Sequence, residues 1–120
     1  MGQVMSVAVL QAKLWYAQRI SAMVLGICVA IHLLMIFYAI RGGLSAQEIL
    51  GRTQGNLVFA IFYEIFVVAC FVHAPIGLAN ILQETFPKKN LAKPLSLLLA
   101  MLILALGTTA VIGVFTGGQL

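Results

Sequence analysis

Charged residues are scarce in this chain. Of its 120 residues only 8% are charged, aspartate is absent, and 62% are hydrophobic, with a mean hydropathy of +1.10. A water-soluble domain needs more polar surface than this, and a disordered chain needs a much lower hydrophobicity. The composition therefore excludes both classes and indicates a membrane protein.

Cysteine and proline are also rare, with two and three residues respectively. Cys28 and Cys70 both fall inside apolar runs, where a thiol behaves as a small hydrophobic group, so they predict neither a disulfide scaffold nor a zinc site. The sequence contains no phosphate-binding glycine loop and no pairing of a nucleophile with a base. We therefore expect the chain not to be an enzyme on its own.

Long apolar runs are what the sequence does contain. Three of them can each cross a bilayer as a helix, which takes about 20 residues. Pro87 and Pro94 flank the second link, and Ser45 with Glu48 forms a possible capping box in the first. We predict an all-α membrane protein with three transmembrane helices in a single membrane-anchor domain over residues 1–120. The predicted helices cover about residues 17–41, 56–83 and 94–116.

The net charge of +4 is best explained by membrane topology, and no nucleic acid is expected as a partner. Basic side chains gather on the cytoplasmic side of a membrane protein. One side of the predicted membrane receives five of them, and only Arg41 and Arg52 fall on the other. The five are Lys13, Arg19, Lys88, Lys89 and Lys93. The N-terminus should therefore be cytoplasmic, or face the matrix if the membrane is mitochondrial.

Three ionisable side chains lie inside the predicted spans: His32, Glu64 and His73. Such groups are costly in lipid unless they are paired or bound, so each marks a candidate site. Two histidines on separate apolar helices suggest axial ligands of b-type heme. The alternative is a histidine that is hydrogen-bonded to a neighbouring carbonyl or hydroxyl group. Glu64 is either a proton-transfer group or a neutral carboxyl bonded to a neighbouring helix.

The helical face around His73 suits a flat macrocycle. Small residues lie one turn before and one turn after it, and polar residues continue the face toward the cytoplasmic end, where propionates or a quinone head group could bind. Taking 1.5 Å per residue, His32 and His73 differ in depth by about 10 Å, which favours two hemes, each completed by a partner subunit. The residues that share the His73 face are Phe66, Ala69, Gly77, Asn80 and Glu84.

The stretch from His73 through Gly77 to Glu84 resembles the second-helix motif of the membrane-anchor subunits of succinate dehydrogenase and fumarate reductase (complex II). That motif is a histidine, a glycine four residues later and an acidic residue seven positions further on. The segment Gln18-Arg19-Ile-Ser21-Ala22 is similar to the element that opens the first helix of both anchor types. The three helices and the chain length match that family as well, so the resemblance covers nearly the whole chain. Two departures are Ala79-Asn80, where many relatives carry Arg-His, and Thr85, where one anchor type has a quinone-binding tyrosine.

The resemblance implies a heme b subunit that transfers electrons between an iron–sulfur subunit and a quinone, either ubiquinone or menaquinone. It also implies a flavoprotein subunit and a second membrane-anchor subunit, with whose helices the three spans form a bundle. The location would be the bacterial inner membrane or the mitochondrial inner membrane. The resemblance places His73 and His32 on heme iron, Arg19 near heme propionate and quinone, and Glu84 beside the quinone. To these we add residues of the same helices: Ser21, Gly77 and Asn80 for the heme site, and Trp15 and Ser21 for the quinone site. The alternative for Trp15 is a residue of the interfacial aromatic belt.

The alternative to two hemes is a single heme, because the common branch of that family lacks a counterpart of His32. A competing hypothesis is a heme-free membrane scaffold or a small transporter subunit. In that case interhelical hydrogen bonds would satisfy both histidines.

Overall fold

The computed structural model of the chain describes residues 1–119. Within them the elements are four helices: α1 (Gly2–Gly42), α2 (Ala46–Thr53), α3 (Leu57–Thr85) and α4 (Ala92–Thr116). Helices α1, α3 and α4 are long and apolar enough to cross a membrane, whereas α2 is a short connecting helix. The prediction of an all-α protein with three spans is confirmed.

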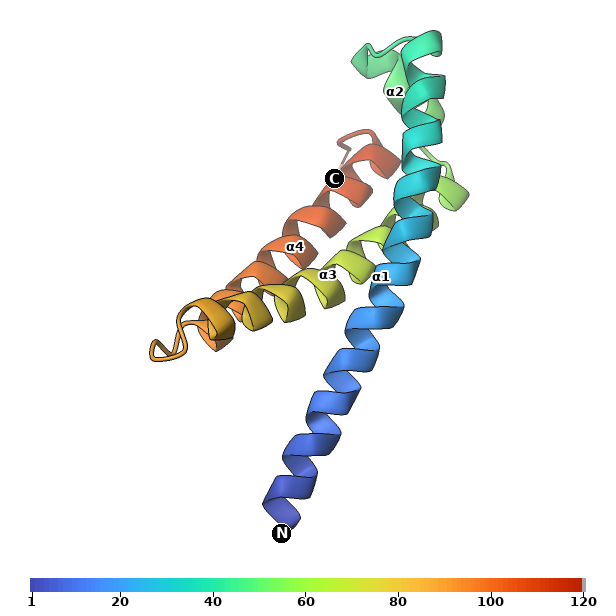
Figure 1. Cartoon of the computed structure of the whole chain (residues 1–120). Coiled ribbons are helices and arrows are strands. Elements are labelled where there is room, and N and C mark those ends of the chain that lie inside the picture. Colours follow the sequence, from blue (N-terminus) through green and yellow to red (C-terminus); the bar gives the residue numbers. More distant parts are fainter. Residues whose placement is uncertain (120) are drawn as a thin grey trace.

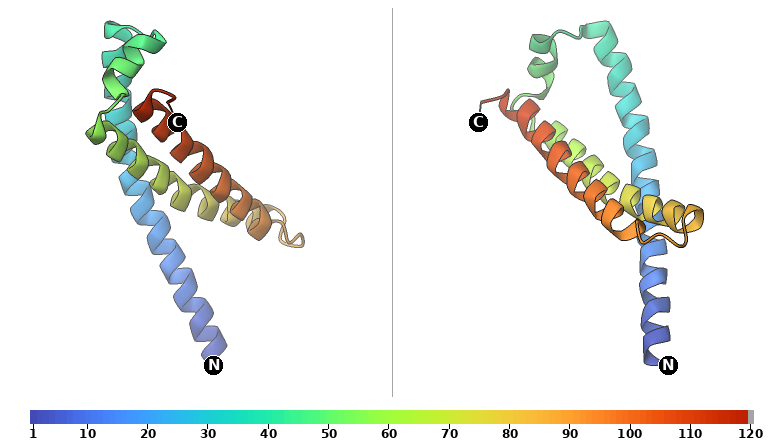
Figure 2. Two further views of the ribbon diagram at one scale, coloured as in Figure 1. Left: turned by 180° about the vertical axis from the view of Figure 1, so that it is seen from behind. Right: turned by 90° about the vertical axis from the view of Figure 1, so that its left-hand side faces the viewer.

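Helix α1 starts much earlier than expected, at Gly2 instead of near residue 17. The prediction placed the start at the first cations, which mark the membrane boundary. No residue between Gly2 and Gly26 breaks a helix, so the backbone stays helical through Lys13 and Arg19. The N-terminal part of α1 extends beyond the ends of α3 and α4 (Figures 1 and 2). At 1.5 Å per residue α1 measures about 60 Å, roughly twice the hydrocarbon thickness of a bilayer.

Helix α3 is the central element, because it packs against α4 on one side and against α1 on another. Figure 1 shows α3 and α4 side by side and α1 crossing α3. Helices α3 and α4 approach closely at Gly107, where a Cβ atom would lie 2.7 Å from Cγ1 of Val67. Because lipid provides no hydrophobic drive between helices, such close approach at small residues is a main source of their association.

Few side chains are buried within the chain. The buried hydrophobic residues of the described part are Cys28, Ala69 and Ala92, and none of its large side chains is fully buried. Exposed leucine, isoleucine, valine and phenylalanine side chains cover all three spans. These surfaces are suited to lipid or to the helices of other subunits.

The predicted capping box at the start of α2 is present. Ser45 Oγ accepts from the Glu48 backbone N–H at 3.2 Å, while Glu48 Oε2 accepts from the Ser45 backbone N–H at 2.9 Å and from its hydroxyl at 2.7 Å. These hydrogen bonds to the charged form lower the pKa of the Glu48 carboxyl. The box fixes the first turn of α2, directly after α1 ends.

The other end of α2 holds the end of α4. The Thr53 hydroxyl donates to the Val114 carbonyl at 3.0 Å, and the Gly55 N–H donates to the Phe115 carbonyl at 2.9 Å. The last carbonyls of a helix have no partner within that helix, so these donors supply what α4 lacks. Gly55 reaches its position with φ of 71°, a conformation that glycine adopts at little cost.

We expect Thr53→Val to lower the free energy of unfolding by about 1 kcal/mol, because the side chain is buried and its hydrogen bond is lost. Thr109→Val is the matched control, since that hydroxyl is exposed and bonds only to the Ala105 carbonyl of its own helix. Thermal unfolding of the purified protein in detergent compares the two. Equal midpoints for both variants would show that Thr53 contributes nothing to this junction.

The turn between α3 and α4 lies where Pro87 and Pro94 predicted it. Helix α3 is capped by Phe86, directly before Pro87, and Pro94 lies in the first turn of α4. Proline cannot continue the first helix but fits the first turn of the next. Lys88, Lys89 and Lys93 therefore cluster at one end of the α3 and α4 pair.

Candidate functional site

His73 lies on α3 where that helix meets α1. Its Nδ1 is 3.3 Å from the backbone carbonyl of Gln18 and 3.4 Å from the hydroxyl of Ser21. A carbonyl oxygen can only accept, so the contact with Gln18 requires the proton on Nδ1 and leaves the lone pair on Nε2. Nε2 has no hydrogen-bond partner among residues 1–119. An imidazole held in this way is oriented to bind a metal through Nε2.

His32 on α1 has a different set of neighbours on α3. Its Nδ1 is 2.7 Å from the Tyr63 phenol oxygen, and its ring lies edge-on to the rings of Tyr63 and Phe66. The phenol also lies 3.4 Å from the sulfur of Met35. If the phenol proton points to that sulfur, the oxygen accepts from Nδ1, and Nε2 again keeps its lone pair. In the described part of the chain, Nε2 of His32 is without a hydrogen-bond partner.

The two histidines lie at different levels along the helices. His73 is beside Ser21, whereas His32 is about three turns, or ~16 Å, further along α1 than Ser21. One metal ion bound by both imidazoles needs its two nitrogen ligands only about 4 Å apart, at metal–nitrogen distances near 2 Å. A single metal therefore cannot bridge them in this arrangement. Among residues 1–119 no cluster of three or more His, Cys, Asp or Glu side chains could hold a metal.

Ser21, which the sequence assigned to both the heme and the quinone site, is buried at the crossing of α1 and α3. It is 6% exposed, and its hydroxyl donates to the Gln18 carbonyl at 3.0 Å while lying beside His73. Gly77, one turn after His73, is also near α1, since a Cβ there would lie 3.3 Å from the side-chain nitrogen of Gln18. Ser21, Gln18 and Gly77 therefore share one neighbourhood with His73.

Asn80 and Glu84 continue the same stretch of α3, and both are exposed. Arg19 and Trp15 on α1 are exposed too, with the Arg19 guanidinium 5.8 Å from the centre of the Trp15 ring. The structure thus brings Arg19 and Trp15 together, and Ser21 and His73 together. Within residues 1–119, Glu84 makes no hydrogen bond to either pair.

Glu64 forms a hydrogen bond with a neighbouring helix, one of the two alternatives for this carboxyl. The Thr108 hydroxyl of α4 donates to Glu64 Oε1 at 2.9 Å. Glu64 also lines an open slot of about 590 Å³ between α1 and α3, whose walls otherwise carry mostly apolar side chains and Ser21. Glu64 therefore takes part in the contact between α3 and α4 and also forms part of the wall of this slot.

The sequence did not assign roles to Gln18, Tyr63 and Thr108, each of which contacts a candidate site residue. Tyr63 gave a usable signal, because a phenol inside a predicted span needs a polar partner. Gln18 Oε1 is buried without a hydrogen bond, and the residue lies in the motif already identified around Arg19 and Ser21. Its contact with His73 is made by the backbone carbonyl, which every residue has, so side-chain chemistry could not indicate it.

Comparison with known proteins gives one result. The model of the succinate dehydrogenase/fumarate reductase transmembrane subunit family matches residues 3–111. No curated protein and no solved structure matches the chain. The match covers all of α3 and most of α1 and α4, including both histidines. The chain therefore belongs to the succinate dehydrogenase/fumarate reductase transmembrane subunit family.

Proposed function

We propose that this chain is the heme-bearing and quinone-binding membrane anchor of a succinate:quinone oxidoreductase, with His73 and His32 each on the iron of a separate heme b. The observation that carries the proposal is the state of the two rings. In both, Nδ1 has a partner on the opposite helix while Nε2 has none within residues 1–119. Because the rings lie ~16 Å apart along α1, each heme would take its second ligand from a partner subunit.

The residues around His73 fit a heme ligand. The Gln18 carbonyl and the Ser21 hydroxyl fix the ring, and such hydrogen bonds raise the basicity of the ligating nitrogen. Heme iron, when bound, supplies one-electron transfer. Arg19 and Asn80, exposed near this level, would donate to the propionates. Gly77, one turn from the ligand, lets the Gln18 side chain of α1 pack close to α3.

The quinone surface proposed here comprises Trp15, Arg19, Ser21 and Glu84. Arg19 would stabilise negative charge on a quinone oxygen, as a fixed cation does at a site with little water. The Arg19 guanidinium lies over the Trp15 ring, and this cation–π contact would hold the guanidinium in place. Glu84 is an exposed carboxyl at the C-terminal end of α3, where it can pass protons between water and the quinone. Glu64, bonded to Thr108, is proposed as a second proton-transfer group deeper in the membrane.

The proposed partners are an iron–sulfur subunit, a flavoprotein subunit and a second membrane-anchor subunit, within the bacterial or the mitochondrial inner membrane. Succinate or fumarate chemistry would belong to the flavoprotein, and this chain would only transfer electrons. The apolar surface that the three spans leave exposed supports a second anchor subunit. The five cations toward the Lys88 and Lys89 turn support a cytoplasmic or matrix location for that end and for the N-terminus.

A pyridine hemochrome assay on the purified complex tests the proposal, with the subunits quantified in the same preparation. The expected result is two b-type hemes for each copy of this chain. One heme would remove His32 from the ligand set and leave its Tyr63 bond as a structural contact. A colourless complex with all subunits present would overturn the proposal in favour of a heme-free scaffold.

A further inference from the structure

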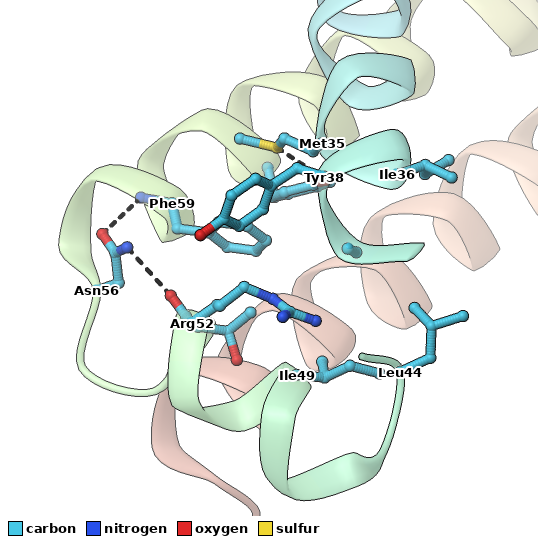
Figure 3. Close-up of a pocket in the computed structure, with 11 residues that line it drawn as sticks. Met35, Ile36, Tyr38, Leu44, Ile49, Arg52, Asn56 and Phe59 are labelled. Carbon is cyan, nitrogen blue, oxygen red and sulfur yellow. Dashed lines mark hydrogen bonds between the residues drawn. The ribbon is translucent and has the colours of Figure 1, made fainter. Parts of the chain in front are cut away.

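A second pocket lies at the end of the molecule away from His73. It has a volume of about 510 Å³ and is enclosed by the C-terminal turns of α1, by α2 and by the first turns of α3 (Figure 3). We call it the α2 pocket. Most of its wall is apolar, with Ile36, Leu44, Ile49 and Phe59 among the lining residues, and Arg52 is its only charged residue. The proposed electron-transfer function uses none of these five side chains, although Tyr63, the partner of His32, also lines the pocket.

Arg52 is held in place and forms no ion pair within residues 1–119, although its charge helps to lower the pKa of the nearby Glu48 carboxyl. Its Nη2 donates to the Gly43 carbonyl at 2.7 Å, the one hydrogen bond that the described part of the chain gives its side chain. A guanidinium has five N–H donors, so most of them stay available. Glu48, one turn earlier on α2, has the spacing and order for an ion pair with Arg52. Its Oε2 is instead hydrogen-bonded to Ser45 in the capping box.

Hydrogen bonds at both ends of α2 hold in place the helix that carries Arg52. The capping box holds the start of the helix, and the bond from Thr53 to the Val114 carbonyl holds its end. The Asn56 side-chain amide donates to the Arg52 carbonyl while its oxygen caps α3. In Figure 3 Arg52 from α2 and Tyr38 from α1 lie on opposite sides of the pocket. A charged side chain held this way beside an apolar wall is arranged for an anion that carries a hydrocarbon tail.

The position of the pocket along the membrane normal identifies the class of that anion. α1 ends at Gly42 and α3 begins at Leu57, so the pocket lies where two spans leave the hydrocarbon layer. Tyr38, about one turn before the end of α1, lines it, and tyrosine is typical of the headgroup level. A free phosphate ion would gain nothing from the apolar wall, whereas the phosphodiester of a phospholipid would bind Arg52 while its acyl chain covers that wall.

We infer that the α2 pocket binds one membrane phospholipid, with its phosphodiester on the Arg52 guanidinium and an acyl chain along Ile36, Leu44 and Phe59. The site is separate from the quinone surface, which lies at the other end of α3. It would link α1, α2 and α3 at the membrane boundary opposite the lysine turn.

The test uses native mass spectrometry of the complete complex, delipidated in detergent and then supplied with dioleoyl phosphatidylglycerol. One lipid should bind to each copy of this chain, and Arg52→Gln should weaken it at least about tenfold, the loss expected for a charge-assisted hydrogen bond. Arg41→Gln is the matched control, because Arg41 is exposed at the same end of α1 and does not line the pocket. Equal weakening in both variants would reduce the effect to general surface charge and overturn the inference.

Three further arms separate the possible ligands. Dioleoylglycerol, which has the tails without the phosphate, and inorganic phosphate should each bind at least tenfold more weakly than the phospholipid. Ile49→Trp, which fills the apolar wall and keeps Arg52, should also abolish binding, so the result does not depend on one variant being stable. A quinone that displaces the lipid from this pocket would overturn the inference. The heme content of Arg52→Gln should be unchanged, because Arg52 contacts neither histidine, and this separates the lipid site from the proposed heme sites.

Discussion

Replacement of His73 by alanine is expected to remove one of the two b-type hemes that we propose for the assembled complex. His73 is the only histidine of α3, and its Nε2 has no hydrogen-bond partner within residues 1–119. Reduced-minus-oxidised spectra and a hemochrome assay should show about half of the original heme, with the remaining half dependent on His32. Quinone reduction should fall with it, since a relay lacking one carrier must transfer electrons over a longer distance.

Two variants test whether His73 acts as a ligand or only as a packing residue. His73→Gly supplied with free imidazole should recover the low-spin spectrum, because the added base can occupy the place of the ring. Ser21→Ala should keep His73, the proposed iron ligand, but weaken its orientation, at a cost of about 10- to 100-fold in heme affinity, as is typical for groups that position a ligand. Heme content that is unchanged in His73→Ala would contradict the ligand assignment.

Gly107→Ala is expected to destabilise the protein by about 1 to 3 kcal/mol, the usual cost of overpacking a tight contact. The added Cβ would lie 2.7 Å from Cγ1 and 2.8 Å from Cγ2 of Val67, distances at which α3 and α4 must separate or Val67 must move. Thermal unfolding of the purified complex in detergent measures the loss. Val67→Ala combined with Gly107→Ala should recover most of it, because the double variant restores the space.

Gly113→Ala on the same helix is the matched control. A Cβ at that position meets no other atom within 4 Å, and alanine favours a helix over glycine. This variant should therefore be neutral or slightly more stable than the parent protein. If Gly107→Ala and Gly113→Ala had equal midpoints, the close approach between α3 and α4 would make no contribution to stability.

The sequence by itself determined the three spans and most of their ends. Apolar runs of this length must be helical in lipid, because every backbone group has to bond within its own segment. Ser45 and Glu48 indicated the capping box, and Pro87 and Pro94 indicated the turn, because caps and prolines determine the backbone conformation of only a few neighbouring residues. The cost of ionisable groups in lipid was enough to single out His32, Glu64 and His73.

The tertiary structure alone decided what those three side chains contact. Gln18, Tyr63 and Thr108 are their partners, and each comes from another helix, more than 30 residues away along the chain. Periodicity places a residue on a face of its own helix, but it does not say which neighbour covers that face or at what level two helices cross. The sequence could not predict the extension of α1 to Gly2, because a charge marks the membrane boundary without ending a helix. It could not predict the α2 pocket either, because this pocket forms only through the packing of three helices.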